Sequence, residues 1–216
     1  MARIWRLGIA LVAVLAVGGT AAASAQAGFV AGSYPAKLSG TQLEQFIFFS
    51  AAAELKCKTS DFAGELTEAA SSLSLTARTE GCSTGGGIVV MAVSMNGCTY
   101  RFTQGAKVAE GEWSSGLKIE CPMGKEIVWE NPEHNCVART PAQEVSSTST
   151  LRNTAKEPGT ILLTTAASGI HYTLEKTFGC VGMPAPGTYT NGKYQGTAEL
   201  SAANPETSKG IDLRLE

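Results

Sequence analysis

The sequence has few of the residues that acid–base enzymes and metal proteins use most. It contains two histidines, His134 and His171, and two aspartates, Asp61 and Asp212, among 216 residues. Only 17% of the residues are charged, the net charge is −2, and Lys and Arg form no cluster. Such a chain lacks the basic patch with which proteins bind nucleic acid. We therefore expect no nucleic-acid partner.

Cysteine pairs with metal-ligand spacing are also missing. The sequence has no C-x₂-C pair, which is the spacing typical of structural zinc sites. His134 lies two residues before Cys136, but one histidine next to an oxidised cysteine is a poor metal ligand set. The run Gly85–Gly87 lacks the Lys-Ser/Thr that completes a phosphate-binding loop. We expect no metal and no cofactor.

Long hydrophobic runs are confined to the start of the chain. Two arginines precede the apolar run Leu7–Val17, and small residues follow it. This order is typical of a secretory signal peptide, cleaved after Ala25 or Ala27. The alternative is an uncleaved leader, which is the only membrane attachment that we expect. The sequence thus predicts a signal peptide over 1–27 and a single domain over 28–216, secreted outside the cell or held in the cell envelope.

Helical periodicity of more than a couple of turns is absent after the leader. Apolar and polar residues instead alternate over many stretches, as in Leu73–Ala77 and Leu117–Cys121. About a dozen such stretches, separated by Gly, Pro, Asn and Ser, predict an all-β fold. The expected architecture is an antiparallel β-sandwich or sandwich-like barrel of about a dozen short strands.

The stretch Ile88–Phe102 gives the clearest local prediction. Its Asn96-Gly97 dipeptide is preferred in two-residue hairpin turns, because both turn positions need a positive φ. The turn fixes the register, which would place Val93 opposite Tyr100 on an apolar face. We therefore predict a β-hairpin here.

The same turn chemistry predicts two further turns. Ser168-Gly169 would join Thr160–Thr165 to Ile170–Phe178 as a second hairpin. Asn191-Gly192 would turn the chain within Tyr189–Tyr194.

Six cysteines follow the leader, an even number that predicts three disulfides in an oxidising compartment. They are Cys57, Cys82, Cys98, Cys121, Cys136 and Cys180. Six cysteines allow fifteen pairings, so the choice depends on geometry. A hairpin centred near Ala69 would join Cys57 to Cys82, and one near Ala109-Glu110 would join Cys98 to Cys121. Cys136 and Cys180 would then form a long-range bridge.

One stretch formally matches a catalytic motif. Gly81–Gly85 fits G-x-S-x-G, with Ser83 as nucleophile and Glu144 and His171 as its partners. That motif requires a strand before the serine and a helix after it. More glycine and a strand follow here, and a disulfide cysteine precedes the serine, so a glycine-rich loop is the favoured interpretation.

Two pairs of glutamates offer another catalytic alternative. Glu110 with Glu112, or Glu126 with Glu130, have the residue types of a glycosidase acid and nucleophile. Charged glutamates beside strands more often form the solvated face of a sheet. We therefore predict no catalytic residue.

Aromatic residues suggest a binding surface. Trp113, Tyr189 and Tyr194 could form a platform for sugar rings or a partner protein, because Trp and Tyr combine apolar area with a polar group. Trp113 lies in a polar Gly/Ser setting and is the aromatic residue expected to be exposed. The alternative is that Trp129 belongs to the core and that the tyrosines form a cross-strand pair.

Three segments carry a resemblance to a family. Met95–Phe102, Leu117–Lys125 and Asn135–Val137 resemble a group of uncharacterised secreted proteins of actinobacteria, in which an N-G-C-x-Y-x-F hairpin precedes a C-P-x-G-K turn. The resemblance covers about Ala36 to Gln143. It implies a secreted β-fold and transfers no activity and no site residue.

Three functional hypotheses follow. The first is a non-enzymatic structural or binding protein outside the cell or in its envelope, with a cell-wall glycan or another envelope protein as partner. The second is a carbohydrate- or ligand-binding module that uses the aromatic residues. The third, a secreted hydrolase, requires Ser83 or a glutamate pair to meet a histidine in one pocket.

Overall fold

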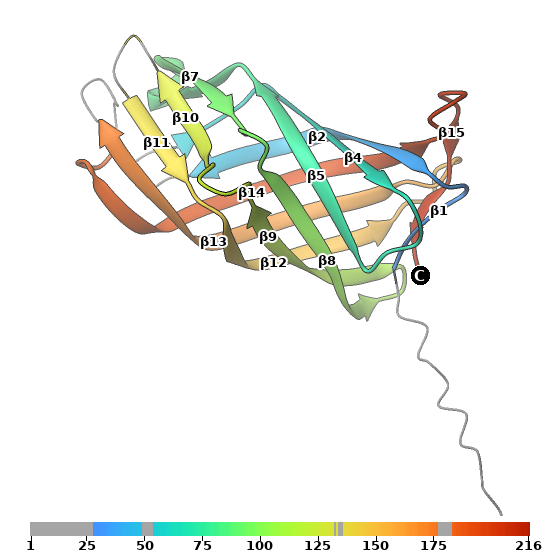
Figure 1. Cartoon of the computed structure of the whole chain (residues 1–216). Helices are drawn as coiled ribbons and strands as arrows, with labels where there is room; N and C mark the ends of the chain where they lie inside the picture. The colour runs from blue at the N-terminus through green and yellow to red at the C-terminus, as the bar shows by residue number, and fades with distance from the viewer. Residues whose placement is uncertain (1–27, 49–53, 132, 134–135, 177–182) are drawn as a thin grey trace, which may run out of the picture.

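The computed structural model describes residues 28–48, 54–131, 133, 136–176 and 183–216 (Figure 1). They form sixteen strands and one 3₁₀ turn, Gly85–Gly87. Every strand pairing is antiparallel. The prediction of an antiparallel all-β fold is therefore confirmed. The strands are not uniformly short, since β13 (Ile161–Lys176) has 16 residues and β14 (Gly187–Ala203) has 17.

Eight of the strands pair side by side and close on themselves in a ring. Their order is β2-β4-β5-β8-β9-β12-β13-β14, and β14 pairs again with β2. Besides β13 and β14, they are β2 (Ala36–Phe48), β4 (Thr59–Leu66), β5 (Ser72–Glu80), β8 (Thr99–Ala109), β9 (Glu112–Glu120) and β12 (Gln143–Asn153). Alternation turns one face of each strand inward, so that Leu73 and Leu75 in β5 and Leu117 and Ile119 in β9 are buried.

Five shorter strands extend the sheet beyond one end of the ring. They are β3 (Glu54–Leu55), β6 (Cys82–Thr84), β7 (Val89–Ser94), β10 (Ile127–Asn131) and β11 (Cys136–Thr140). We call them the extension. β11 pairs with the C-terminal part of β13, and the order continues through β10 and β7 to β6. The chain alternates between the two regions, because β4–β5 and β8–β9 lie in the ring whereas β6–β7 and β10–β11 lie in the extension.

A small sheet closes the other end of the ring. β1 (Phe29–Ala31) pairs with β16 (Leu213–Leu215), and Phe29 and Leu213 are fully buried. The side-chain amide of Asn153 donates to the Leu215 carbonyl at 3.0 Å, and its oxygen accepts from the Leu215 N–H at 2.8 Å. β15 (Gly210–Ile211) pairs with the end of β14. Figure 1 shows β1 and β15 at the end of the molecule opposite β7, β10 and β11.

The predicted hairpin over Ile88–Phe102 is wrong, although its turn is correct. Asn96 and Gly97 have φ values of 50° and 83°, and the Cys98 N–H donates to the Met95 carbonyl at 2.7 Å. The strands then separate, because β7 pairs with β6 and β10 in the extension and β8 pairs with β5 and β9 in the ring. Val93 therefore lies opposite Trp129 instead of Tyr100.

The two other predicted turns are also wrong. Gly169 has a φ of 71°, but it lies at an irregularity within the continuous strand β13. Asn191 and Gly192 continue β14, which pairs with β13 on one side and with β2 on the other. Two long neighbouring strands offer β14 more backbone hydrogen bonds than a local hairpin would, so the strand stays extended.

Two disulfides join pairs of described cysteines, and both match the predicted pairing. Cys57 is bonded to Cys82, and Cys98 is bonded to Cys121. Each bond closes the open end of a ring hairpin, β4–β5 or β8–β9. The third predicted bridge involves Cys180, which lies outside the described residues. Disulfides of this kind indicate an oxidising compartment.

The predicted signal peptide, residues 1–27, also lies outside the described residues. In the described part of the chain, no helix has the length and apolar character needed to cross a membrane.

Candidate functional site

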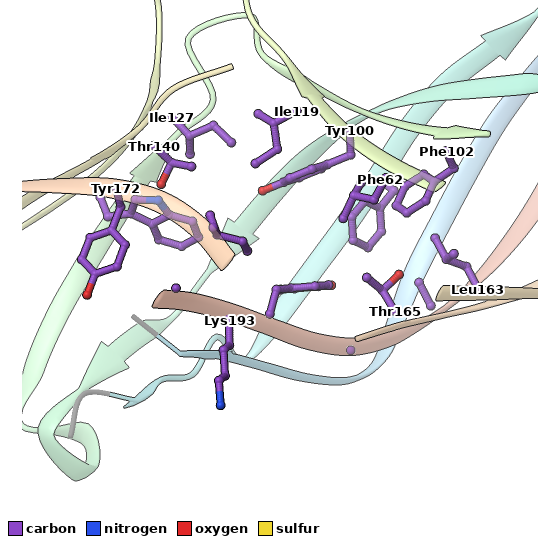
Figure 2. A pocket seen from close by; sticks show the side chains of 17 residues that line it. Phe62, Tyr100, Phe102, Ile119, Ile127, Thr140, Leu163, Thr165, Tyr172 and Lys193 are labelled. Carbon is purple, nitrogen blue, oxygen red and sulfur yellow. The ribbon is translucent and has the colours of Figure 1, made fainter. Parts of the chain in front are cut away.

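A cavity lies inside the molecule where the ring meets the extension (Figure 2). It has a volume of about 60 Å³, against roughly 10–15 Å³ for a single water. The extension supplies Ile127, Trp129 and Thr140. Ring strands supply Phe62, Tyr100, Phe102, Leu117, Ile119, Leu163, Thr165, Ile170, Tyr172, Tyr194 and Ala198. Its walls are mostly apolar, and six of these side chains are aromatic.

The cavity exists because one wall carries almost no side-chain volume. Gly192, Gly196 and Ala198 alternate with outward-facing residues on β14, so the inner face of this strand is flat on both sides of Tyr194. Gly196 pairs with Thr165 on β13, which is also small. Closed sheets of this size are normally filled by their own side chains, so a run of small inward residues leaves a space.

Tyr194 covers one of these glycines. A Cβ atom built on Gly196 would lie 2.7 Å from the Tyr194 hydroxyl oxygen and 3.1 Å from the Glu44 carbonyl oxygen. The tyrosine therefore occupies the place where a side chain at 196 would be, as aromatic residues often do beside glycines in sheets. A side chain at position 192 is excluded more strictly, because a Cβ atom built on Gly192 would lie 2.7 Å from the Ile170 carbonyl oxygen, which belongs to the backbone.

Two tyrosine hydroxyls reach the cavity from opposite strands of the ring. Burial raises the pKa of Tyr100 to about 12. Burial, and to a lesser degree the nearby Tyr100, also raise the pKa of Tyr194. Both phenols therefore stay protonated, and able to donate a hydrogen bond, at any ordinary pH.

Among the described residues that line the cavity, Lys193 is the one charged residue. Lys193 reaches the edge of the cavity, but its side chain points away from the other lining residues, as Figure 2 shows. No aspartate, glutamate, arginine or histidine is among the lining residues in the part of the chain that the structure describes. The chemistry available to a bound molecule is therefore apolar contact together with neutral hydroxyl groups.

The predicted aromatic platform does not form as expected. Trp113 is only 7% exposed, and the Lys107 ammonium nitrogen lies over its indole, 5.6 Å from the indole centroid. The prediction that Trp113 is exposed is wrong, because β9 directs the Trp113 side chain toward the inside of the ring of strands. Tyr194 lines the cavity, and Tyr189 stacks on Tyr172 with ring centroids 5.2 Å apart and an interplanar angle of 19°.

The candidate catalytic residues do not converge. Ser83 lies in β6 and His171 in β13, and β7, β10 and β11 separate these strands in the sheet. His171 is exposed, and its backbone N–H donates to the Gln143 side chain at 2.8 Å. No helix follows Ser83, because the 3₁₀ turn leads directly to β7.

The glutamate pairs and the second histidine give no site either. Glu110 and Glu112 lie at the tip of the β8–β9 hairpin. Glu126 directly precedes β10, and Glu130 lies on the exposed face of β10. His134 lies outside the described residues. Among the described residues, no three His, Cys, Asp or Glu side chains are grouped closely enough to hold a metal ion.

One sequence pattern indicates the small inner face of β14. Gly192, Tyr194, Gly196 and Ala198 follow each other at every second position, the spacing of one face of a strand. A glycine inside a strand pattern indicates a close approach or a missing side chain as well as a turn. The Asn-Gly dipeptide favoured the turn, and the small inner face was therefore missed.

Comparison of the chain with protein-family models, with curated proteins and with solved structures finds no match in any of the three.

Proposed function

We propose that this protein is a secreted or envelope-associated, non-enzymatic binding protein that holds a small, largely apolar molecule in the cavity. One observation carries the proposal: the cavity in this disulfide-bonded sheet is lined by six aromatic side chains, and Lys193, the one charged residue among its described lining residues, points away from the others. Pockets for small molecules are typically concave and apolar, with a few polar groups that orient the ligand.

The walls suit a ring-shaped molecule better than a sugar. Sugar rings need many hydrogen-bonding groups around them. The described lining residues offer five side-chain hydroxyls, those of Tyr100, Thr140, Thr165, Tyr172 and Tyr194. The buried position of Trp113 also removes the residue on which the carbohydrate hypothesis depended most.

The test is the binding of fluorobenzene, followed by ¹⁹F NMR on the disulfide-bonded protein. We expect saturable binding with a Kd below about 1 mM, which corresponds to about −4 kcal/mol. In a Trp5→Phe/Trp113→Phe background, Trp129 is the one remaining tryptophan of the three in the sequence. Its emission should change over the same concentration range, because Trp129 lines the cavity. A linear, non-saturating response would contradict the proposal.

Filling the cavity should abolish this binding. Ala198 is 5% exposed and faces the space, so Ala198→Leu and the larger Ala198→Phe would occupy it. We expect Ala198→Leu to weaken fluorobenzene binding by at least tenfold with a melting temperature close to that of the wild type. Gln195→Leu adds a similar side chain on the exposed face of the same strand and should leave binding unchanged. If folded Ala198→Leu and Ala198→Phe bind fluorobenzene as tightly as the wild type, the ligand lies elsewhere.

A further inference from the structure

Four residues with hydroxyl groups line the cavity, and no hydrogen bond joins these hydroxyls to the residues that the structure describes. Thr140 and Thr165 are 5% and 2% exposed, and neither hydroxyl has a hydrogen-bond partner within the described part of the chain. The same is true of Tyr100 and Tyr194 over these residues. A hydroxyl that faces a cavity can form a hydrogen bond only with what fills the cavity, and most polar groups inside proteins are paired. A molecule that occupies this space therefore meets four residues with hydroxyl groups.

The four groups come from four different strands. Tyr100 lies on β8, Thr140 on β11, Thr165 on β13 and Tyr194 on β14. Figure 2 shows the Tyr100 hydroxyl pointing into the cavity, toward the side that carries Ile127 and Thr140. Hydrogen-bonding groups therefore lie around a mostly aromatic space. A ligand with an aromatic ring could form a hydrogen bond at the edge of that ring while the faces of the ring contact apolar side chains.

All four groups are neutral. A hydroxyl both donates and accepts, so it pairs with a hydroxyl or carbonyl oxygen of a ligand. An ionised carboxylate or ammonium would lose its hydration here, which disfavours its burial strongly. The Lys193 ammonium group at the edge points away from the space and does not compensate a carboxylate inside it. A pure hydrocarbon would leave the four hydroxyls unpaired.

Resting on the proposed function, we infer that the ligand is a neutral ring compound that carries a hydroxyl or carbonyl oxygen, and that Tyr100 and Thr165 help to hold this oxygen. Recognition by neutral hydroxyls separates this class from hydrocarbons and from charged amphiphiles of the same size.

Three probes of nearly equal size test this inference by ¹⁹F NMR at pH 7: fluorobenzene, 4-fluorophenol and 4-fluorobenzoate. We expect 4-fluorophenol to bind about tenfold more tightly than fluorobenzene, since it pairs with a group that the hydrocarbon leaves unpaired. The ionised 4-fluorobenzoate should bind at least tenfold more weakly than 4-fluorophenol.

Variants test which residues cause the preference for 4-fluorophenol over fluorobenzene. Tyr100→Phe and Thr165→Val each remove a hydroxyl with little change in shape. Each should reduce the ratio of the fluorobenzene Kd to the 4-fluorophenol Kd several-fold, while the fluorobenzene Kd stays within about twofold. Tyr189→Phe is the matched control. It removes a phenol that lies outside the cavity and donates to the Ala185 carbonyl, so it should leave the ratio unchanged.

The outcomes separate the inference from the proposal beneath it. Equal affinities for fluorobenzene and 4-fluorophenol, or tighter binding of 4-fluorobenzoate, would overturn the neutral-oxygen inference and leave the binding function intact. An unchanged ratio in both Tyr100→Phe and Thr165→Val would remove these residues from recognition. Failure of all three probes to bind the folded protein would overturn the proposed function itself.

Discussion

Replacing Cys98 and Cys121 by alanine is expected to lower the free energy of unfolding by about 3 kcal/mol, and the same change at Cys57 and Cys82 should cost about as much. The bonds span 23 and 25 residues, and cross-links over loops of this length restrict the unfolded chain by about 3 kcal/mol each. Removing both should cost about 6 kcal/mol, which is comparable to the whole stability of many domains. Urea unfolding followed by circular dichroism measures each loss.

Binding should respond as well, because the bonds lie where the chain leaves the ring. Cys121 directly follows β9 and precedes the turn into β10, which carries Ile127 and Trp129 of the cavity wall. We expect the Cys98→Ala/Cys121→Ala protein to bind fluorobenzene more weakly even where it is folded. Reductant should destabilise the wild type more than the variant that already lacks both bonds. A loss below about 1 kcal/mol in either double variant would contradict the entropic argument.

The disulfide pairing was predictable because it depends on local sequence alone. Each confirmed bond joins the two ends of one hairpin, so the turn region and the alternation of residues around it define which cysteines meet. Leu73 and Leu75, or Leu117 and Ile119, alternate with polar residues and are buried as their pattern predicts. These features need no knowledge of distant strands.

The pairing of strands distant in sequence was not predictable in this way. Asn96-Gly97 forms the expected turn, yet β7 pairs with β6 and β10 in the extension, whereas β8 pairs with β5 and β9 in the ring. Gly169 and Gly192 carry the same local signal and lie inside continuous strands. The cavity depends on the closure of β14 against both β13 and β2, and no local pattern contains that closure.

Alkaline pH is expected to destabilise the protein through the two tyrosines of the cavity. Below pH 10 both phenols are protonated in the folded and unfolded states, so their stabilising contribution is fully present. As the pH rises above 10 the unfolded chain ionises first, because an unperturbed tyrosine has a pKa of about 10 and burial raises the pKa of Tyr100 to about 12 in the folded protein. Stability is therefore lost between about pH 10 and 12.

The loss from Tyr100 alone should approach about 3 kcal/mol above pH 12, since one pKa unit corresponds to about 1.4 kcal/mol. Tyr194, whose pKa burial also raises, adds to it. Urea unfolding between pH 8 and pH 11, followed by far-ultraviolet circular dichroism, should show a steep decrease for the wild type. The Tyr100→Phe/Tyr194→Phe variant should show a shallower one.

The control for this pH effect is Tyr34→Phe, because Tyr34 is 39% exposed and lies outside the cavity. It should keep the steep decrease of the wild type. The double variant should also be close to the wild type in stability at pH 8, since neither removed hydroxyl has a protein partner within the described residues. If it keeps the full alkaline decrease, other groups cause the effect, and the hydroxyls at the cavity are more hydrated than the structure indicates. That result would also weaken the case for a ligand held by these phenols, because the case depends on their exclusion from water.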